Sequence, residues 1–304
     1  MANSRRISAV TLLCAYVLIS AGCASQPAAP VSNISEEEFR DADLDVIFAT
    51  EFPVTSKADA LKRAQTSLEE GDFDKGLYFY VKALNYDPDD AALLYRIGRI
   101  HEHSGNAEMA TRAYTLALGS DPDFVPALEN RGLLLLAHHE DSRAKQDLMR
   151  AVVMDATAWR AQNGLGLLED RAGNHMQAIA HYSAALDVMP GVAEILNNRG
   201  YSRMLAGESS SAEVDLRQSA ALGYQKAWIN LGALLAKGGE YGKAVKALNE
   251  VLDEPESLNR AAEVAIENGD RDVAQRLLEK AIEQSPVYFP DAEQNLALLV
   301  AEDY

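Results

Sequence analysis

The sequence has little cysteine and little positive charge. Two cysteines occur in 304 residues, Cys14 and Cys23, which excludes a disulfide framework. The chain carries 28 Lys and Arg against 46 Asp and Glu, a net charge of −18. This balance argues against a nucleic-acid partner, because phosphate binding needs clustered basic side chains. No apolar run beyond the first 25 residues approaches the roughly 20 residues of a membrane-spanning helix. The 48% of hydrophobic residues nevertheless suffices for a folded core.

The N-terminus has the pattern of a targeting signal. Arg5 and Arg6 precede an apolar run over residues 7–20, which is too short to span a bilayer and typical of a signal-peptide core. The run leads into Ser20-Ala21-Gly22-Cys23, which resembles the lipobox of bacterial lipoproteins. The resemblance implies a signal peptide over 1–22 and a lipid on the thiol of Cys23 that attaches the protein to the membrane. An ordinary cleaved signal or an uncleaved anchor is the alternative.

The residues after Cys23 predict an address and a tether. In lipoproteins an Asp after the cysteine usually signals retention in the inner membrane, so Ala24 implies the outer membrane and a protein that faces the periplasm. Residues 24–35 are small, polar and Pro-containing, which predicts a flexible tether that reaches about 40 Å. Ser35 and the acidic residues 36–38 predict a cap for a short acidic helix that runs toward Phe48. We therefore assign 23–56 to the lipidated cysteine, the tether and this acidic segment.

After residue 56 the sequence repeats with a period of 34 residues. A first set of small residues is followed twelve positions later by a second small set, and four positions after that by a large residue. The first set is Ala64, Gly98, Gly132, Gly166 and Gly200; the second is Gly76, Ala110, Ala144, Ala178 and Ala212; the large set is Tyr80, Tyr114, Leu148, Tyr182 and Leu216.

Each unit predicts two helices of about 12–14 residues. Turns are expected at Gly71, Gly105, Gly173, Gly207, Gly239 and Gly269. We expect the first small set to face the second, which lets the antiparallel helices approach closely. The recurrent proline, as in Pro88, Pro122 and Pro190, ends the second helix.

This pattern resembles the tetratricopeptide repeat (TPR), and the segment Trp228-Ile229-Asn230-Leu231-Gly232 resembles its signature most closely. The resemblance implies an all-α solenoid, a right-handed superhelix of helix-turn-helix units. Seven units are expected over 57–288, and a C-terminal helix within 289–304, at about Asp291 to Glu302, would cover the last apolar face. The expected units are 57–90, 91–124, 125–158, 159–192, 193–224, 225–254 and 255–288.

The resemblance also implies a concave groove, lined by the first helix of each unit, that captures protein segments. Asparagine offers a donor and an acceptor to a ligand's backbone, tyrosine adds flat contact area, and arginine receives an acidic group. The alternative is that the asparagines serve packing within the repeat. The predicted groove residues are Tyr95, Arg96, Arg99, Asn130, Arg160, Asn163, Asn197, Asn198, Tyr201 and Asn230.

Motifs for chemistry are scarce, so we expect neither an enzyme nor a small-molecule substrate, cofactor or metal. The sequence has no Gly-rich phosphate loop, no nucleophile elbow and no zinc spacing. The best metal candidate is a group of histidines one repeat apart, because imidazole suits transition metals; the alternative is polar residues at helix ends. These residues are His101, Glu102, His103, His138 and His139.

Two function classes remain, a membrane-anchored adaptor for assembly of an envelope machine and, remotely, a metal-binding protein or enzyme. Within the first class, the segment Leu196-Asn197-Asn198-Arg199-Gly200-Tyr201 and the ending Ser285-Pro286-Val287-Tyr288 with Asn295-Leu296 resemble the tight-adherence (Flp) pilus assembly lipoprotein family TadD. A type IV pilotin or an adaptor for cell-wall hydrolases would look similar, as would a component of a secretion system.

Overall fold

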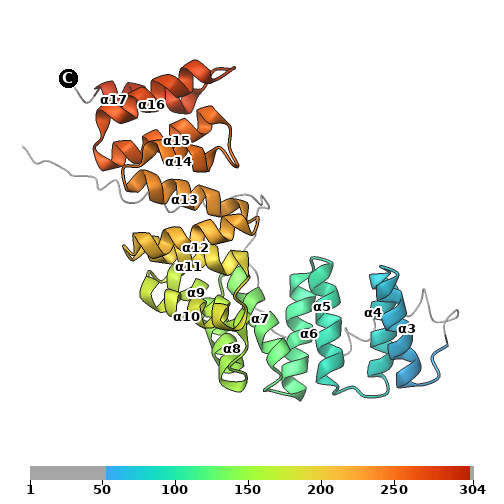
Figure 1. Cartoon of the computed structure of the whole chain (residues 1–304). Helices are drawn as coiled ribbons and strands as arrows, with labels where there is room; N and C mark the ends of the chain where they lie inside the picture. The colour runs from blue at the N-terminus through green and yellow to red at the C-terminus, as the bar shows by residue number, and fades with distance from the viewer. Residues whose placement is uncertain (1–52, 302–304) are drawn as a thin grey trace, which may run out of the picture. The chain divides into compact units, whose positions relative to one another are not determined.

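The computed structural model describes residues 53–301 of the chain, and from Val54 onward they belong to one compact unit. The predicted signal peptide, Cys23 and the tether lie outside the described residues. Within 53–301 every regular element is a helix (Figure 1). The helices are α3 (Lys57–Glu69), α4 (Phe73–Leu84), α5 (Ala91–His103), α6 (Ala107–Ser120), α7 (Val125–Ala137), α8 (Asp141–Met154), α9 (Trp159–Arg171), α10 (His175–Val188), α11 (Ala193–Leu205), α12 (Ser209–Ala221), α13 (Gln225–Lys237), α14 (Tyr241–Leu248), α15 (Glu254–Asn268), α16 (Arg271–Gln284) and α17 (Pro290–Ala301).

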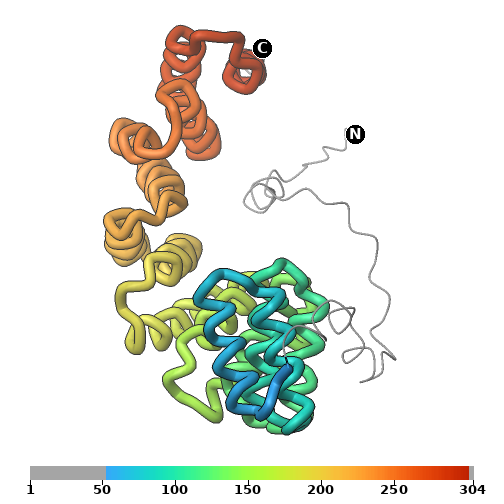
Figure 2. Tube along the Cα trace, turned by 90° about the vertical axis from the view of Figure 1, so that its right-hand side faces the viewer, coloured from blue at the N-terminus to red at the C-terminus, as the bar shows by residue number. Residues whose placement is uncertain are grey.

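Successive helices pair into hairpins, and each hairpin packs on the next (Figures 1 and 2). The odd-numbered helix of each pair is the first helix of a unit, and the even-numbered helix is the second. First helices of neighbouring units also contact one another from α7 through α9, α11, α13 and α15 to α17. The all-α solenoid of helical hairpins predicted from the repeat is therefore confirmed.

Local sequence signals explain where the helices begin and end. Ser56, Asp72 and Asp90 are N-caps whose side-chain oxygens accept hydrogen bonds from backbone N–H groups in the first turn. The turns within six units end at a glycine in the left-handed region, which glycine adopts without strain. These are Gly71, Gly105, Gly173, Gly207, Gly239 and Gly269, with φ between 74° and 83°. In the third unit His139 takes this place with φ 60°.

The small residues of the first helices do not face the partners expected from the sequence. A Cβ on Gly166 would lie 2.5 Å from Cε1 of Tyr182, and the same close approach joins Gly98 to Tyr114 at 2.4 Å. The partner is thus the large residue sixteen positions later, and the expected pairing of Gly166 with Ala178 is wrong. Helical side chains lean toward the N-terminus of their helix, so the Tyr182 ring covers the turn that precedes its own Cα.

These large side chains form the core between the two helices of a unit. Tyr114, Tyr182, Leu148 and Leu216 are fully buried. They lie in apolar clusters that continue from one unit into the next. Among the described residues, no helix combines the length and the apolar character that crossing a bilayer requires.

Candidate protein-binding face

All ten predicted groove residues lie on five first helices, α5, α7, α9, α11 and α13, which we call the first-helix row. Direct contacts join α7 to α9, α9 to α11 and α11 to α13. Helix α5 carries Tyr95, Arg96 and Arg99; α7 carries Asn130; α9 carries Arg160 and Asn163; α11 carries Asn197, Asn198 and Tyr201; and α13 carries Asn230.

Asparagine amides meet across three neighbouring units of the row. Asn230 Nδ2 donates to Asn197 Oδ1 at 2.8 Å, which joins α13 to α11. Asn197 Nδ2 in turn lies 3.4 Å from Asn198 Oδ1, and Asn198 Nδ2 lies 3.5 Å from Asn163 Oδ1 on α9. A run of polar amides therefore crosses the row from unit to unit.

Two predicted groove residues are not accessible. Asn130 is 1% exposed and Asn197 is 6% exposed. Asn130 Nδ2 donates to Tyr114 Oη at 3.1 Å and to Glu102 Oε2 at 3.2 Å, and its Oδ1 accepts from Arg160 Nη1 at 2.8 Å. Both asparagines satisfy their amides inside the fold, which is the packing role that the sequence left open.

The aromatic and basic residues of α5 divide between packing and surface. The Tyr95 ring lies 5.7 Å from that of Phe124, and its hydroxyl accepts from Arg99 Nη1 at 3.2 Å, so Tyr95 is partly structural. Arg96 is exposed, with its guanidinium 6.0 Å from the centroid of the Tyr80 ring. The Arg99 side chain is 54% exposed. Arg96 and Arg99 are thus accessible cations in a strongly acidic chain.

Buried carboxylate–tyrosine bonds support the row from beneath. Tyr114 Oη donates to Glu102 Oε2 at 2.6 Å, and burial raises the pKa of the Tyr114 hydroxyl far above its usual range, so it remains a neutral donor. The same arrangement recurs 68 residues later, where Tyr182 Oη donates to Asp170 Oδ2 at 2.9 Å. Ser202 Oγ donates to this carboxylate as well, at 2.6 Å.

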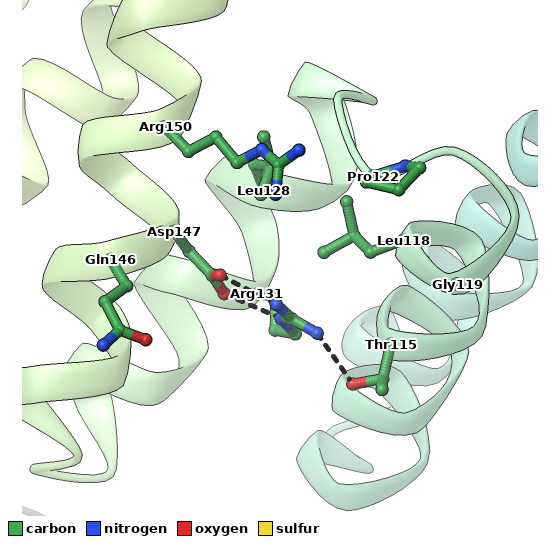
Figure 3. Close-up of a pocket in the computed structure, with 9 residues that line it drawn as sticks. All are labelled: Thr115, Leu118, Gly119, Pro122, Leu128, Arg131, Gln146, Asp147 and Arg150. Carbon is green, nitrogen blue, oxygen red and sulfur yellow. Dashed lines mark hydrogen bonds and ion pairs between the residues drawn. The ribbon is translucent and has the colours of Figure 1, made fainter.

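An arginine–aspartate pair joins three helices, and it too recurs after 68 residues. Arg131 on α7 donates from Nε and Nη2 to the two carboxylate oxygens of Asp147 on α8, both at 2.7 Å (Figure 3). Its Nη1 donates to Thr115 Oγ1 on α6 at 3.2 Å. Arg199 and Asp215 form the equivalent pair at 2.8 Å.

The sequence reasoning missed these bonds between units. The signal that could have found them is the tripeptide Asn-Arg-Gly at both 130–132 and 198–200, followed sixteen residues after each arginine by an aspartate. A period of two units lies over the period of one.

The histidines do not form a metal site. Burial lowers the pKa of His101, and the His103 ring stacks on Phe73 with centroids 4.1 Å apart. His138 and His139 lie exposed in the turn between α7 and α8. Across residues 53–301, no three His, Cys, Asp or Glu side chains are grouped so that they could hold a metal ion.

Three family models, each described as the tetratricopeptide repeat, match residues 67–130, then 129–191 and 163–222, and finally 225–254. The chain belongs to the tetratricopeptide-repeat family. Human tetratricopeptide repeat protein 7A is 29% identical over 128 residues, 42% of this chain and 15% of that protein. Human tetratricopeptide repeat protein 7B is 32% identical over 107 residues, 35% of this chain and 13% of that protein. The TPR chain described here therefore matches a small part of the length of these relatives.

Solved TPR structures share the fold. A TPR protein from Parabacteroides merdae superposes with a TM-score of 0.56 at 18% identity, covering 80% of this chain and 98% of that one. PilF from Pseudomonas aeruginosa superposes with a TM-score of 0.51 at 17% identity, covering 81% of this chain and 97% of that one. At these identities the likeness concerns the fold alone. TPR folds typically mediate contacts between proteins rather than catalysis.

Proposed function

We propose that this TPR protein is a membrane-anchored scaffold that binds a segment of a partner protein along its first-helix row. It serves the assembly of an envelope machine, a tight-adherence (Flp) pilus or a secretion system. The observation that carries the binding proposal is the set of polar side chains on contacting first helices that are at least partly exposed: Arg96, Arg99, Asn163, Asn198, Tyr201 and Asn230.

The chemistry of these side chains favours a polypeptide ligand. Within the described residues, Nδ2 of Asn163 and Oδ1 of Asn230 make no hydrogen bond, so a donor and an acceptor remain for a ligand's backbone. Because backbone groups are the same in every sequence, such amides hold an extended segment while its side chains reach other contacts. Arg96 and Arg99 add a place for an acidic group.

The membrane and the machine are inferred from the sequence. The lipobox at 20–23 and Ala24 support an outer-membrane lipoprotein that faces the periplasm, and several acyl chains would hold it there, since each buried methylene contributes about 0.8 kcal/mol. The segment 196–201 and the ending around Tyr288 support a pilus of the Flp type. An adaptor for cell-wall hydrolases or a type IV pilotin would bind a different partner, so the identity of the captured protein separates these alternatives.

The binding proposal is tested by changing the row without changing the core. The variant Arg96→Ala, Asn163→Ala, Tyr201→Ala leaves Tyr95 in place, because Tyr95 packs against Phe124. Each lost anchor costs about 1–2 kcal/mol at a peptide site, so capture should weaken at least tenfold. The measurement is pull-down from envelope extracts, followed by titration of the captured protein.

The matched control replaces three exposed residues of second helices: Gln177→Ala, Gln218→Ala and Lys246→Ala. Both variants should melt as the parent does. If the folded row variant keeps its partners and the control loses them, the first-helix row is not the binding surface.

The anchor is tested separately. Cys23→Ser should release the protein from membranes or leave it as unprocessed precursor, since Cys23 is the one thiol at the predicted lipobox. Membrane fractionation with intact mass measures both outcomes. A variant that still fractionates with the outer membrane at mature mass contradicts the lipoprotein proposal and leaves the binding proposal untouched.

A further inference from the structure

A pocket of about 430 Å³ lies between the second helices α6 and α8, with α7 at its base. Its volume falls in the range of ligand-binding pockets, about 300–1,000 Å³. Nine residues line it, drawn in Figure 3: Thr115, Leu118, Gly119, Pro122, Leu128, Arg131, Gln146, Asp147 and Arg150. We call it the α6–α8 pocket.

The walls of the α6–α8 pocket are apolar on one side and carry paired charges on the other. Leu118, Pro122 and Leu128 form the apolar part. Both basic side chains are paired with carboxylates: Arg131 with Asp147 at 2.7 Å, and Arg150 with Asp123 at 2.7 Å. The pocket therefore offers no unpaired charge to an ionic ligand, and it suits an uncharged apolar group.

One hydrogen-bonding side chain at the pocket has no partner. The Gln146 amide on α8 makes no hydrogen bond within the described residues, so a donor and an acceptor are both available. A group that carries a donor and an acceptor together is what this amide would bind, and the peptide unit of a polypeptide is such a group.

Gly119 opens the pocket without a structural need for glycine. It lies inside α6 with helical φ, and a Cβ added there would meet nothing within 4 Å. Other units have larger residues at this register position, namely Asn85, Val153, Asp187 and Ala221. Glycine weakens a helix relative to alanine, and a glycine that packing does not require marks a place where another group approaches closely.

The rim of the pocket is exposed and apolar. Met149 and Val153 on α8 are 51% and 74% exposed, and they lie on the same stripe of α8 as Gln146 and Arg150. Exposed apolar side chains next to a pocket mark interaction sites, and methionine adapts its shape to different partners.

We propose that the α6–α8 pocket is a second protein-binding site, which takes one large apolar side chain from an uncharged segment of a partner while Gln146 pairs with the backbone of that segment. The site shares no residue with the first-helix row. It therefore goes beyond the function proposed above and can fail or succeed without it.

The probe is a library of random 12-residue peptides displayed on phage, selected against the full-length protein. Selected peptides are synthesised and titrated against the parent, Gly119→Leu and Gly242→Leu. Gly242 is the matched control, because it also lies in a helix, α14, with nothing within 4 Å of its added Cβ. Circular dichroism should show that both variants fold and melt at or above the temperature of the parent, since leucine forms helix better than glycine.

The expected result is a group of peptides that share a large apolar residue without neighbouring charges. These peptides should bind Gly119→Leu at least tenfold more weakly than the parent and Gly242→Leu equally well. The same peptides should keep their affinity for the variant Arg96→Ala, Asn163→Ala, Tyr201→Ala. The proposal is overturned if no selected peptide loses affinity for Gly119→Leu. It is also overturned if the peptides that do lose affinity are charged, or if all selected peptides depend on the first-helix row.

Discussion

Replacing Gly166 with Ala tests the packing rule of the repeat with a single methyl group. The added Cβ would lie 2.5 Å from Cε1, 2.7 Å from Cδ1 and 2.8 Å from Cζ of Tyr182. Carbon atoms pack about 3.5–4.0 Å apart, so the ring or the helix must move by about 1 Å. Tyr182 has little freedom to move, because it is fully buried and its hydroxyl donates to Asp170 at 2.9 Å.

The magnitude follows from three contributions. Overpacking typically costs about 1–3 kcal/mol. A weakened hydrogen bond to the Asp170 carboxylate adds up to about 1.5 kcal/mol, and alanine returns about 1 kcal/mol through its better helix propensity. We therefore expect Gly166→Ala to lower the free energy of unfolding by about 2 kcal/mol. For a folded body of this size the melting temperature should fall by about 4–8 °C.

Thermal unfolding followed by circular dichroism at 222 nm measures this change, with Gly242→Ala as the control. Gly242 lies in α14 with nothing within 4 Å of its added Cβ, so the control should be neutral or slightly stabilising. In a Tyr182→Ala background the space is empty, and Gly166→Ala should then cost nothing. If Gly166→Ala melts with the control, or if its cost persists beside Tyr182→Ala, the Gly166–Tyr182 contact does not govern the helix approach.

Three further predictions concern charge and backbone. Asp147→Ala should destabilise by about 3 kcal/mol in urea unfolding, because it leaves the largely buried Arg131 unpaired, whereas Glu213→Ala, which breaks an exposed pair with Arg217, should change stability by less than about 0.5 kcal/mol. Burial raises the pKa of Glu129, so this carboxyl contributes stability when protonated and loses it as pH rises through its folded pKa. Glu129→Gln should therefore be at least as stable as the parent at pH 7, with the difference shrinking or reversing below about pH 4, as melting temperatures across this range would show. His139→Gly should stabilise by about 0.5 kcal/mol, since φ of 60° strains a residue with a Cβ; equal or lower stability in urea would contradict this.

The sequence predicted the helices and the fold because the repeat fixes both through residue types with one physical meaning. Glycine at the turn positions adopts the left-handed backbone that ends a helix, and the apolar set marks the buried faces. The partner of Gly166 was wrong because spacing along the chain does not say which way a side chain leans. Tyr182 reaches back by one turn, and this direction follows from helix geometry rather than from the register.

The candidate face was predicted only in part, for a different reason. Register places a side chain on the inner side of a helix, but it does not say whether another side chain has already taken its hydrogen bonds. Asn130 and Asn163 come from the same row, yet the first is enclosed by Glu102, Tyr114 and Arg160, while the second is partly exposed. These partners lie 28, 16 and 30 residues away from Asn130, so the enclosure depends on how the units stack.

The hairpins of this protein contact their neighbours in chain order, and this arrangement has a consequence for dynamics. In such an array, the opening of one unit depends on the stability of that unit and of the two that flank it. Amide protons in the terminal units should therefore exchange with solvent fastest, and those near α9 to α11 slowest. A partner laid across α9, α11 and α13 would act as a splint. It would lengthen proton lifetimes in the flanking units that it never touches, and a map of these lifetimes would show where it lies.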